Sequence, residues 1–130
     1  MNDIPYFEET LLKTKRLRCS FLRNDKLQAM RFAGIVVAED WRPLRAVFSL
    51  VMGLNGACIL DLSDVMLFDS TLYSVVIWLR LARETRGCRF AIVARERTES
   101  RLLAAGIGKW LPIYRDFSSA RAELFPPEQL

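Results

Sequence analysis

The sequence contains no histidine, and this absence removes several classes of site at once. Histidine is the usual general base near neutral pH, the common partner of a nucleophilic serine or cysteine, and the commonest zinc ligand. The chain also has no CxxC pair for a metal or redox centre, and no GxGxxG or GxxxxGK[ST] loop for a nucleotide phosphate. We therefore predict a protein that is not an enzyme and that uses no cofactor.

Long apolar runs and paired cysteines are also missing. No stretch approaches the ~20 apolar residues that span a bilayer, and residues 1–18 mix acids and bases, so we expect neither direct membrane insertion nor a signal peptide. The three cysteines, Cys19, Cys58 and Cys88, are an odd number, far apart, and each lies in an apolar stretch. They predict free, buried thiols in a cytoplasmic protein.

What is present is the composition of one packed domain. Of the 130 residues, 52% are apolar and 26% are charged, which is typical of a globular protein and not of a disordered one. The net charge of +4 comes from 19 basic and 15 acidic residues spread along the chain. Such dispersed basic residues, with few aromatic residues beside them, predict a solubilising surface and no nucleic-acid partner.

The apolar periodicity predicts a hairpin followed by alternating helices and strands. Residues 17–22 and 27–32 form the hairpin, Asp40 caps a helix that ends at Gly53, and residues 57–62 form a buried strand before a turn at Ser63–Asp64. A long helix over residues 72–86 stops at Gly87, and a buried strand over 88–94 follows. Next come a short helix from Thr98 to Gly106, an edge strand over 110–114 and a helix capped by Ser118 or Ser119.

This order of elements predicts an α/β fold in which a small mixed β-sheet is covered by about four helices. We assign residues 17–125 to the domain. Residues 1–16 lack clear periodicity and form an N-terminal extension, in which residues 6–7 and 11–12 pack on the domain or belong to a loose arm. Residues 126–130 begin with a Pro-Pro stop and form a C-terminal tail.

The middle of the chain resembles the STAS domain, which bacterial anti-sigma-factor antagonists and sulfate transporters share. Leu60–Val65 matches the central strand of that family and the turn after it. Phe68–Ser70 matches the motif in which a serine follows an aspartate and opens a helix. Ala105–Ile107 and Leu111–Tyr114 match the later helix end and the strand after it. The resemblance extends from about residue 17 to residue 124.

Two positions depart from the family pattern. Leu72 stands where the family has a glycine that lets a partner approach closely, and the apolar Gly34–Val37 replaces an acidic turn. Both changes fall on the surface that docks a partner kinase in the family.

The resemblance implies a protein-interaction module of signal transduction and transcription regulation. Its partner would be an anti-sigma factor that is also a serine kinase, or a related regulatory protein, and the resemblance leaves room for a homodimer. Carried over by position, Ser70 is the phosphorylation site, and the phosphate releases the partner. The implied partner-binding residues are Asp69, Ser70, Thr71, Leu72, Tyr73 and Ile77.

Alternatives remain open for these residues. One alternative is a scaffold subunit of a transport or signalling assembly that no kinase modifies. In that case Asp69 or Ser70 is only the N-cap of a helix. An enzyme or small-ligand site at residues 61–70 is a further alternative. Asp61, Asp64 and Asp69 each fit a strand end, a turn or a cap, and no other ligands accompany them, so we predict no metal site.

The helix after Ser70 carries two apolar stripes. Leu72, Val75, Val76 and Leu79 form one, Tyr73, Ile77 and Leu81 form the other, and Trp78 lies between them. A helix on one side of a sheet buries only one stripe. The second stripe is covered by neighbouring helices or, as we favour, docks a partner.

Overall fold

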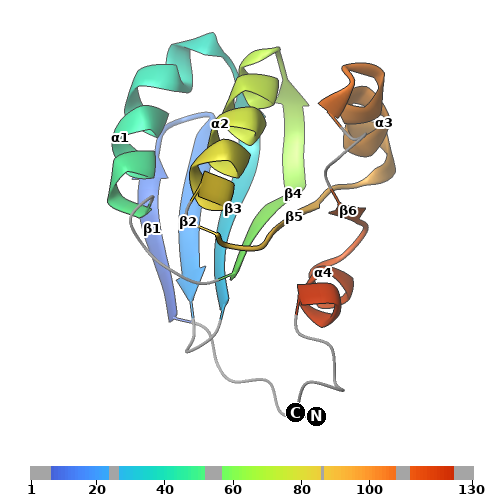
Figure 1. Cartoon of the computed structure of the whole chain (residues 1–130). Coiled ribbons are helices and arrows are strands. Elements are labelled where there is room, and N and C mark those ends of the chain that lie inside the picture. Colours follow the sequence, from blue (N-terminus) through green and yellow to red (C-terminus); the bar gives the residue numbers. More distant parts are fainter. Residues whose placement is uncertain (1–6, 24–26, 52–56, 86, 108–111, 125–130) are drawn as a thin grey trace.

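The computed structural model describes residues 7–23, 27–51, 57–85, 87–107 and 112–124. These residues form one six-stranded sheet with helices packed on it (Figure 1). The elements are β1 (Phe7–Lys13), β2 (Leu17–Arg23), β3 (Leu27–Val36), the 3-10 turn η1 (Ala38–Asp40), α1 (Trp41–Val51), β4 (Ala57–Phe68), α2 (Thr71–Thr85), β5 (Phe90–Val93), α3 (Glu96–Ala104), β6 (Ile113–Tyr114) and α4 (Phe117–Leu124).

The strands stand in the sheet in the order of the chain. β1, β2 and β3 pair antiparallel, whereas β3, β4, β5 and β6 pair parallel, which makes the sheet mixed. The predicted fold class is therefore confirmed, as is the hairpin of β2 and β3. β5, which lies within the buried strand predicted over 88–94, is the neighbour of β4, and β6 lies at the edge of the sheet.

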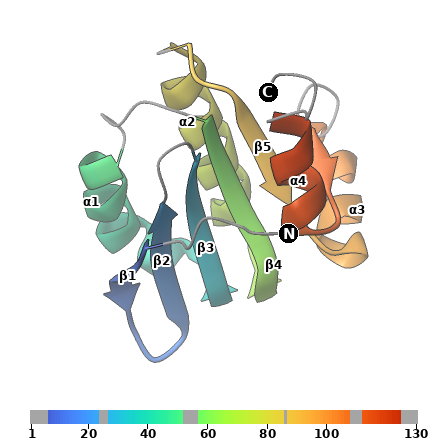
Figure 2. The ribbon, with the colours of Figure 1, turned by 90° about the horizontal axis from the view of Figure 1, so that it is seen from below.

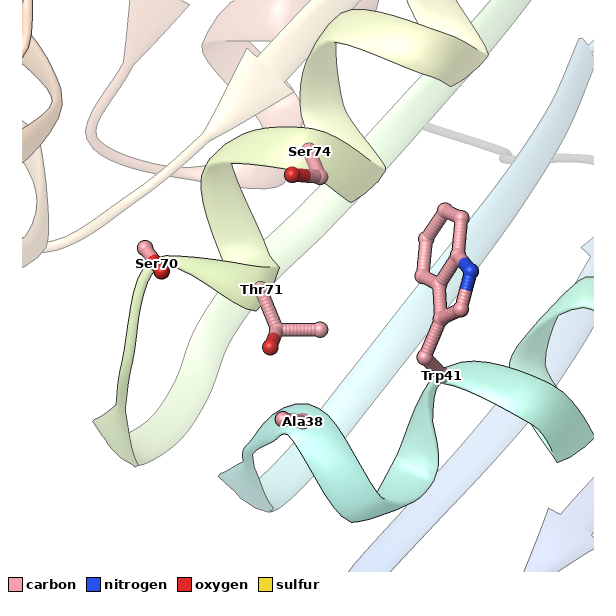
Figure 3. Close-up of a pocket in the computed structure, with 5 residues that line it drawn as sticks. All are labelled: Ala38, Trp41, Ser70, Thr71 and Ser74. Carbon is pink, nitrogen blue, oxygen red and sulfur yellow. The ribbon is translucent and has the colours of Figure 1, made fainter.

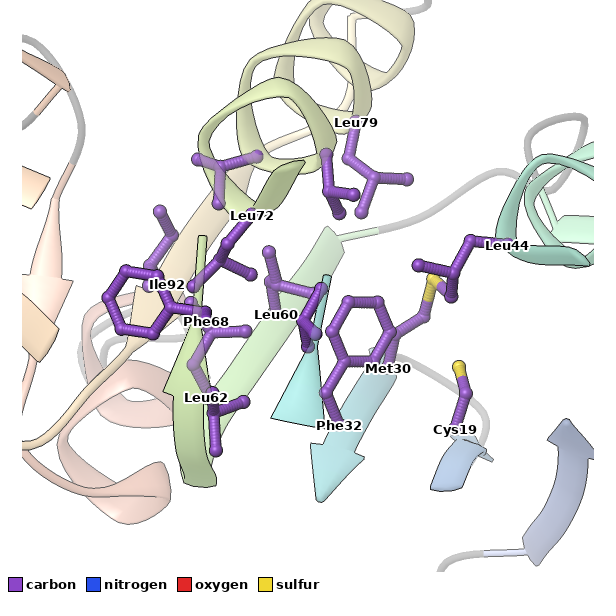
Figure 4. Close-up of a cluster of buried hydrophobic side chains, with 14 of the residues drawn as sticks. Cys19, Met30, Phe32, Leu44, Leu60, Leu62, Phe68, Leu72, Leu79 and Ile92 are labelled. Atoms are coloured by element: carbon purple, nitrogen blue, oxygen red, sulfur yellow. The ribbon is translucent and has the colours of Figure 1, made fainter. Parts of the chain in front are cut away.

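The larger core lies between the sheet and α1, α2 and α3. Leu44 of α1, Leu72 and Leu79 of α2, and Leu102 of α3 are at most 2% exposed. Figure 4 shows Leu72 and Leu79 pointing from α2 toward the sheet residues Leu60, Leu62 and Ile92. A smaller core forms on the opposite face, where Ala120 and Leu124 of α4 pack with strand residues (Figure 2).

The helix α2 has 15 residues and begins at Thr71, one residue before the predicted start. One of its two predicted apolar stripes, made of Leu72, Val75, Val76 and Leu79, is buried against the sheet. The helix ends where Gly87 adopts a φ of +75°, and the Gly87 N–H donates to the Glu84 carbonyl at 2.9 Å. This is the left-handed termination that favours glycine.

The turn predicted at Ser63–Asp64 is wrong, because β4 continues through these residues to Phe68. Between its pairs with Arg31 and with Ala33 of β3, β4 accommodates one extra residue, and this bulge replaces the turn. The Asp61 carboxylate accepts hydrogen bonds from both the N–H (3.0 Å) and the hydroxyl (2.6 Å) of Ser63. These polar residues therefore stabilise an irregular strand and do not reverse the chain.

The predicted helix caps are also partly wrong. Thr98 is buried inside α3, whose N-cap is Arg95. Ser118 and Ser119 lie inside α4, and the Asp116 carboxylate accepts the Ser119 N–H at 2.7 Å. In each case the helix begins earlier than the predicted capping residue.

Asp40 does immediately precede α1, as predicted, but its carboxylate does not cap that helix. It accepts the Val37 N–H at 3.2 Å and an Arg16 N–H at 3.3 Å, so it closes η1 and ties it to the segment between β1 and β2. Gly53, Tyr6, residues 110–111 and the tail at 126–130, all named in the sequence analysis, lie outside the described residues.

Residues 7–13 of the expected N-terminal extension form β1, an edge strand that the sequence does not predict. Gly34 lets β3 pass close to Arg16, which lies in the segment between β1 and β2. Its φ is +107°, and a Cβ placed there would lie 2.0 Å from the Arg16 carbonyl oxygen. β3 can therefore continue to Val36 only with glycine at this position, so Gly34–Val37 is not a turn but the end of a strand and the start of η1.

Two of the three cysteines, Cys19 and Cys58, are buried, and Cys88 is half-buried. All three are free thiols. Burial raises the pKa of Cys19 to about 12 and that of Cys58 to about 11. Both are therefore protonated and unreactive at neutral pH. Among the described helices, none has the length and apolar character needed to cross a membrane.

Candidate functional site

Ser70 lies between the end of β4 and the start of α2, and its side chain is exposed. The sheet ends here with Phe68, so the serine stands at the rim of the domain with the amino end of a 15-residue helix behind it. None of the described residues hydrogen-bonds its hydroxyl. Ser70 therefore opens a helix, as the sequence predicts, and its side chain is exposed.

Asp69 performs the capping that the sequence left open between Asp69 and Ser70. Its Oδ1 accepts the backbone N–H of Thr71 at 2.8 Å, and its Oδ2 accepts the backbone N–H of Ala38 at 3.1 Å. One carboxylate therefore caps α2 and at the same time fastens η1 to it. Ser70 therefore does not cap the helix, and its hydroxyl is available for another role.

Hydrogen bonds hold the pKa of Asp69 below its usual value. The Thr71 hydroxyl contributes most and the Thr71 N–H next, while the Ala38 N–H adds a smaller effect. These donors favour the ionised carboxylate, as expected at a helix amino terminus.

We expect Asp69→Ala to lower the free energy of unfolding by about 1 kcal/mol near pH 7, the usual effect of losing a cap. A lowered pKa means that the stabilisation is complete above the unfolded-state pKa and disappears as the pH falls through the folded-state pKa. Urea unfolding of both proteins between pH 7 and pH 2 measures this difference. A difference that stays constant down to pH 2 would contradict the charged cap.

A pocket of about 420 Å³ opens beside Ser70 between α2 and the start of α1. It is lined by Ala38, Trp41, Ser70, Thr71 and Ser74. Figure 3 shows Trp41 facing the first turns of α2, where Thr71 and Ser74 lie. Three hydroxyl-bearing side chains and one indole ring give the pocket a polar side and an aromatic side.

Aromatic contacts fix α2 on both sides of this pocket. Trp41 and Trp78 meet edge to face at 6.4 Å between ring centroids, which ties α1 to α2. Phe68 and Tyr73 meet in the same way at 6.0 Å, and the Arg101 guanidinium of α3 lies 3.9 Å from the Phe68 ring centroid. These contacts tie α2 to α1 and tie its first turn to the end of β4.

The predicted partner-binding residues do not all face outward. Ser70 and Ile77 are exposed, and Asp69, Thr71 and Tyr73 are half-buried. Leu72 is 0% exposed and packs in the core, so its assignment to the partner surface is wrong. Because its side chain points into the core, it does not shield the Ser70 hydroxyl. The second stripe of α2 is partly open, with Ile77 36% and Leu81 53% exposed.

Asp61 and Asp69, two of the three aspartates considered as metal ligands, lie in different parts of the fold. Asp61 lies on the sheet face opposite α2, where it pairs with Arg31 at 3.0 Å, and Asp69 lies at the start of α2. Within the described ranges, no three acidic or cysteine side chains gather in a way that fits a metal ion.

The sequence analysis missed Trp41 and Ser74. Trp41 precedes Leu44 by three residues and Val47 by six, a spacing that places all three on one face of α1. Ser74 follows Ser70 by four residues, which is one helical turn. Helical spacing from Ser70 and from Leu44 could have found both.

Comparison with known proteins identifies the fold. No family model and no curated protein matches the sequence. Among solved structures, an anti-sigma factor antagonist from Mycobacterium paratuberculosis superposes with a TM-score of 0.72 at 20% identity, covering 91% of this chain and 94% of that one. A Thermotoga maritima protein, provisionally assigned as an anti-sigma factor antagonist, superposes with a TM-score of 0.69 at 22% identity, covering 80% and 92%.

A third match is an uncharacterised protein from Shewanella loihica with a SpoIIAA-like fold, which superposes with a TM-score of 0.52 at 14% identity over 95% of this chain and 98% of that one. Identities this low establish the fold and nothing further. This chain has a STAS-like fold, as its sequence resemblance predicts.

Proposed function

We propose that this chain is a non-catalytic interaction module of the cytoplasm that works as an anti-sigma-factor antagonist. It binds a kinase-type anti-sigma factor, or a related signalling protein, through the Ser70 end of α2, and phosphorylation of Ser70 releases the partner. The support is the shared fold with proteins of that description, together with the geometry around Ser70.

The observation that carries the proposal is that Asp69, and not Ser70, caps α2. Because Asp69 caps the helix, the exposed Ser70 hydroxyl can be modified without loss of a structural hydrogen bond. A phosphate added there gains ~0.3–1 kcal/mol from the helix dipole. The modification therefore acts on the surface and leaves the fold intact.

The docking surface extends from Ser70 along the exposed stripe of α2. Ile77 and Leu81 are partly exposed, and the half-buried Tyr73 continues the stripe toward Phe68. α3 lies beside this end, as the contact of Arg101 with Phe68 shows, and its first turn exposes Arg95 and Arg97. These two arginines would attract an acidic partner surface, and a phosphate on Ser70 would oppose that attraction.

Mass spectrometry tests the proposal most simply. The protein is incubated with ATP and the kinase encoded or purified with it, and the modified residue is mapped. We expect a single phosphate on Ser70. Phosphate on another residue, or none under conditions in which the kinase modifies a control substrate, would contradict the switch.

The second candidate function is a scaffold subunit of a transport or signalling assembly with an unmodified Ser70. The apolar strand end at Gly34–Val37 favours it, because the family has an acidic turn on that side of the docking surface. The same mass-spectrometric experiment separates the two functions, because the scaffold requires a Ser70 that the kinase leaves unmodified.

A further inference from the structure

A polar hollow of about 190 Å³ lies on the sheet face opposite α1 and α2. It is lined by Glu8 of β1, Arg18 and Ser20 of β2, Arg31 and Ala33 of β3, and Asp64 of β4. No described helix packs over these strands here, because α4 covers β4, β5 and β6 instead (Figure 2). The hollow lies on the opposite face of the sheet from α2, and it serves no part of the function proposed above.

The pairing register explains why the sheet is hollowed at this point. Ser20 stands directly across from Arg31, and Arg18 stands across from Ala33. Two small side chains, Ser20 and Ala33, therefore occupy one diagonal, while the long side chains of Arg18 and Arg31 occupy the other. The small residues form the floor and the arginines form the walls.

The floor presents a hydroxyl that opens into the hollow. Ser20 is only 3% exposed, lines the hollow, and receives or donates no side-chain hydrogen bond among the described residues. A ligand oxygen in the hollow would give this hydroxyl a hydrogen-bond partner within the site.

Arg31 is held in place beside this hydroxyl. Its Nε donates to Oδ2 of Asp61 at 3.0 Å, and Asp61 is 2% exposed and fixed from its other oxygen by Ser63. Arg18 is positioned by a 3.4 Å hydrogen bond from its Nη2 to the Thr10 hydroxyl. Two guanidinium groups and a hydroxyl thus line one hollow, and donors of these kinds suit a carboxylate.

The rim alternates in charge. Glu8 and Asp64, on the strands that flank the two arginines, carry carboxylates for which the structure shows no ion pair within the described ranges. A dianion such as phosphate would meet both the arginines and these two acids. A molecule with a carboxylate and a nearby ammonium group would satisfy both kinds of charge. The volume, equal to that of several water molecules at ~30 Å³ each, suits a small amino acid.

We propose that this hollow binds a free α-amino acid with a small side chain, with its carboxylate on Ser20, Arg18 and Arg31 and its ammonium group toward Glu8 or Asp64. The site is formed by three consecutive antiparallel strands and β4, so it exists in the folded domain without a partner.

The test is a titration of the ¹⁵N-labelled protein with glycine, serine, acetate and inorganic phosphate, followed by amide shifts. We expect glycine and serine to give saturable shifts at Ser20, Arg31 and Ala33 with a Kd of about 1 mM, and acetate to bind at least about tenfold more weakly. If acetate or phosphate binds as tightly as the amino acids, the assignment of a zwitterionic ligand is wrong. If neither amino acid gives saturable shifts, the hollow is not a binding site.

Variants locate the binding. Ser20→Ala removes the floor hydroxyl with little change in volume and is expected to weaken glycine binding about tenfold. Ala33→Leu fills the hollow from an outward-facing strand position and should abolish binding. Ser100→Ala, at an exposed position on α3, is the matched control and should leave it unchanged. Unchanged binding in both folded hollow variants would overturn the proposal.

Discussion

Ser70→Asp is expected to weaken partner binding by about a hundredfold and to leave the melting temperature nearly unchanged. The added carboxylate meets the favourable end of the α2 dipole, so the folded domain is not penalised. At the interface the same charge must lose its hydration opposite a surface with no prepared cation, which costs a few kcal/mol. Since 1.4 kcal/mol corresponds to a factor of ten, a hundredfold loss is the expected scale.

The structure also changes what Ser70→Ala should do. A capping serine would lose about 1 kcal/mol on substitution by alanine, as we would expect if Ser70 capped α2. Asp69 carries that role, so Ser70→Ala should keep both binding and stability. Ser118→Asp, an exposed serine in the first turn of α4, is the matched control for charge. Calorimetric titration of the partner and thermal melting measure all three variants, and tight binding by Ser70→Asp would contradict the switch.

The second prediction with a large effect compares substitutions in the two apolar stripes of α2. Leu72→Ala is expected to lower the free energy of unfolding by ~2–5 kcal/mol, because it opens a cavity in a fully buried core position. Ile77→Ala, at a position 36% exposed, should cost at most about 1 kcal/mol but weaken partner binding at least about tenfold. Urea unfolding and binding assays on the same preparations provide both readouts.

A matched control for Ile77 comes from α3. Leu103 is 50% exposed and lies outside the proposed docking stripe, so Leu103→Ala should change neither binding nor stability appreciably. If Leu103→Ala weakens binding as much as Ile77→Ala does, the docking surface has been assigned to the wrong helix. If Leu72→Ala is as stable as the wild type, the core position of Leu72 is wrong.

The sequence predicted the elements with strong periodicity and missed those defined by pairing alone. α2 was predictable because its apolar spacing and Gly87 both act locally. β1 was not, because its residues lack alternation and the strand exists only through its pairing with β2. The Ser63–Asp64 turn failed for a related reason: polar residues that usually reverse a chain here stabilise a bulge that only the β3 register reveals.

The candidate site shows the same limit. The sequence placed Ser70 at a helix start, but it could not decide whether Asp69 or Ser70 is the cap, since both residue types accept hydrogen bonds from helix amides. In the structure the Asp69 carboxylate accepts the Thr71 N–H and also the N–H of Ala38, which is 31 residues away. Leu72 was assigned to the surface from a family position, whereas it belongs to the stripe with Val75, Val76 and Leu79 that the sheet buries.

The most direct test of the central claim is the affinity of one partner for one protein before and after modification. The purified chain, phosphorylated on Ser70 and separated from the unmodified form, is titrated against the partner by calorimetry. The proposal predicts tight binding of the unmodified form and a loss of about a hundredfold or more on phosphorylation, with both forms equally folded. Equal affinity of the two forms would show that Ser70 is not a switch.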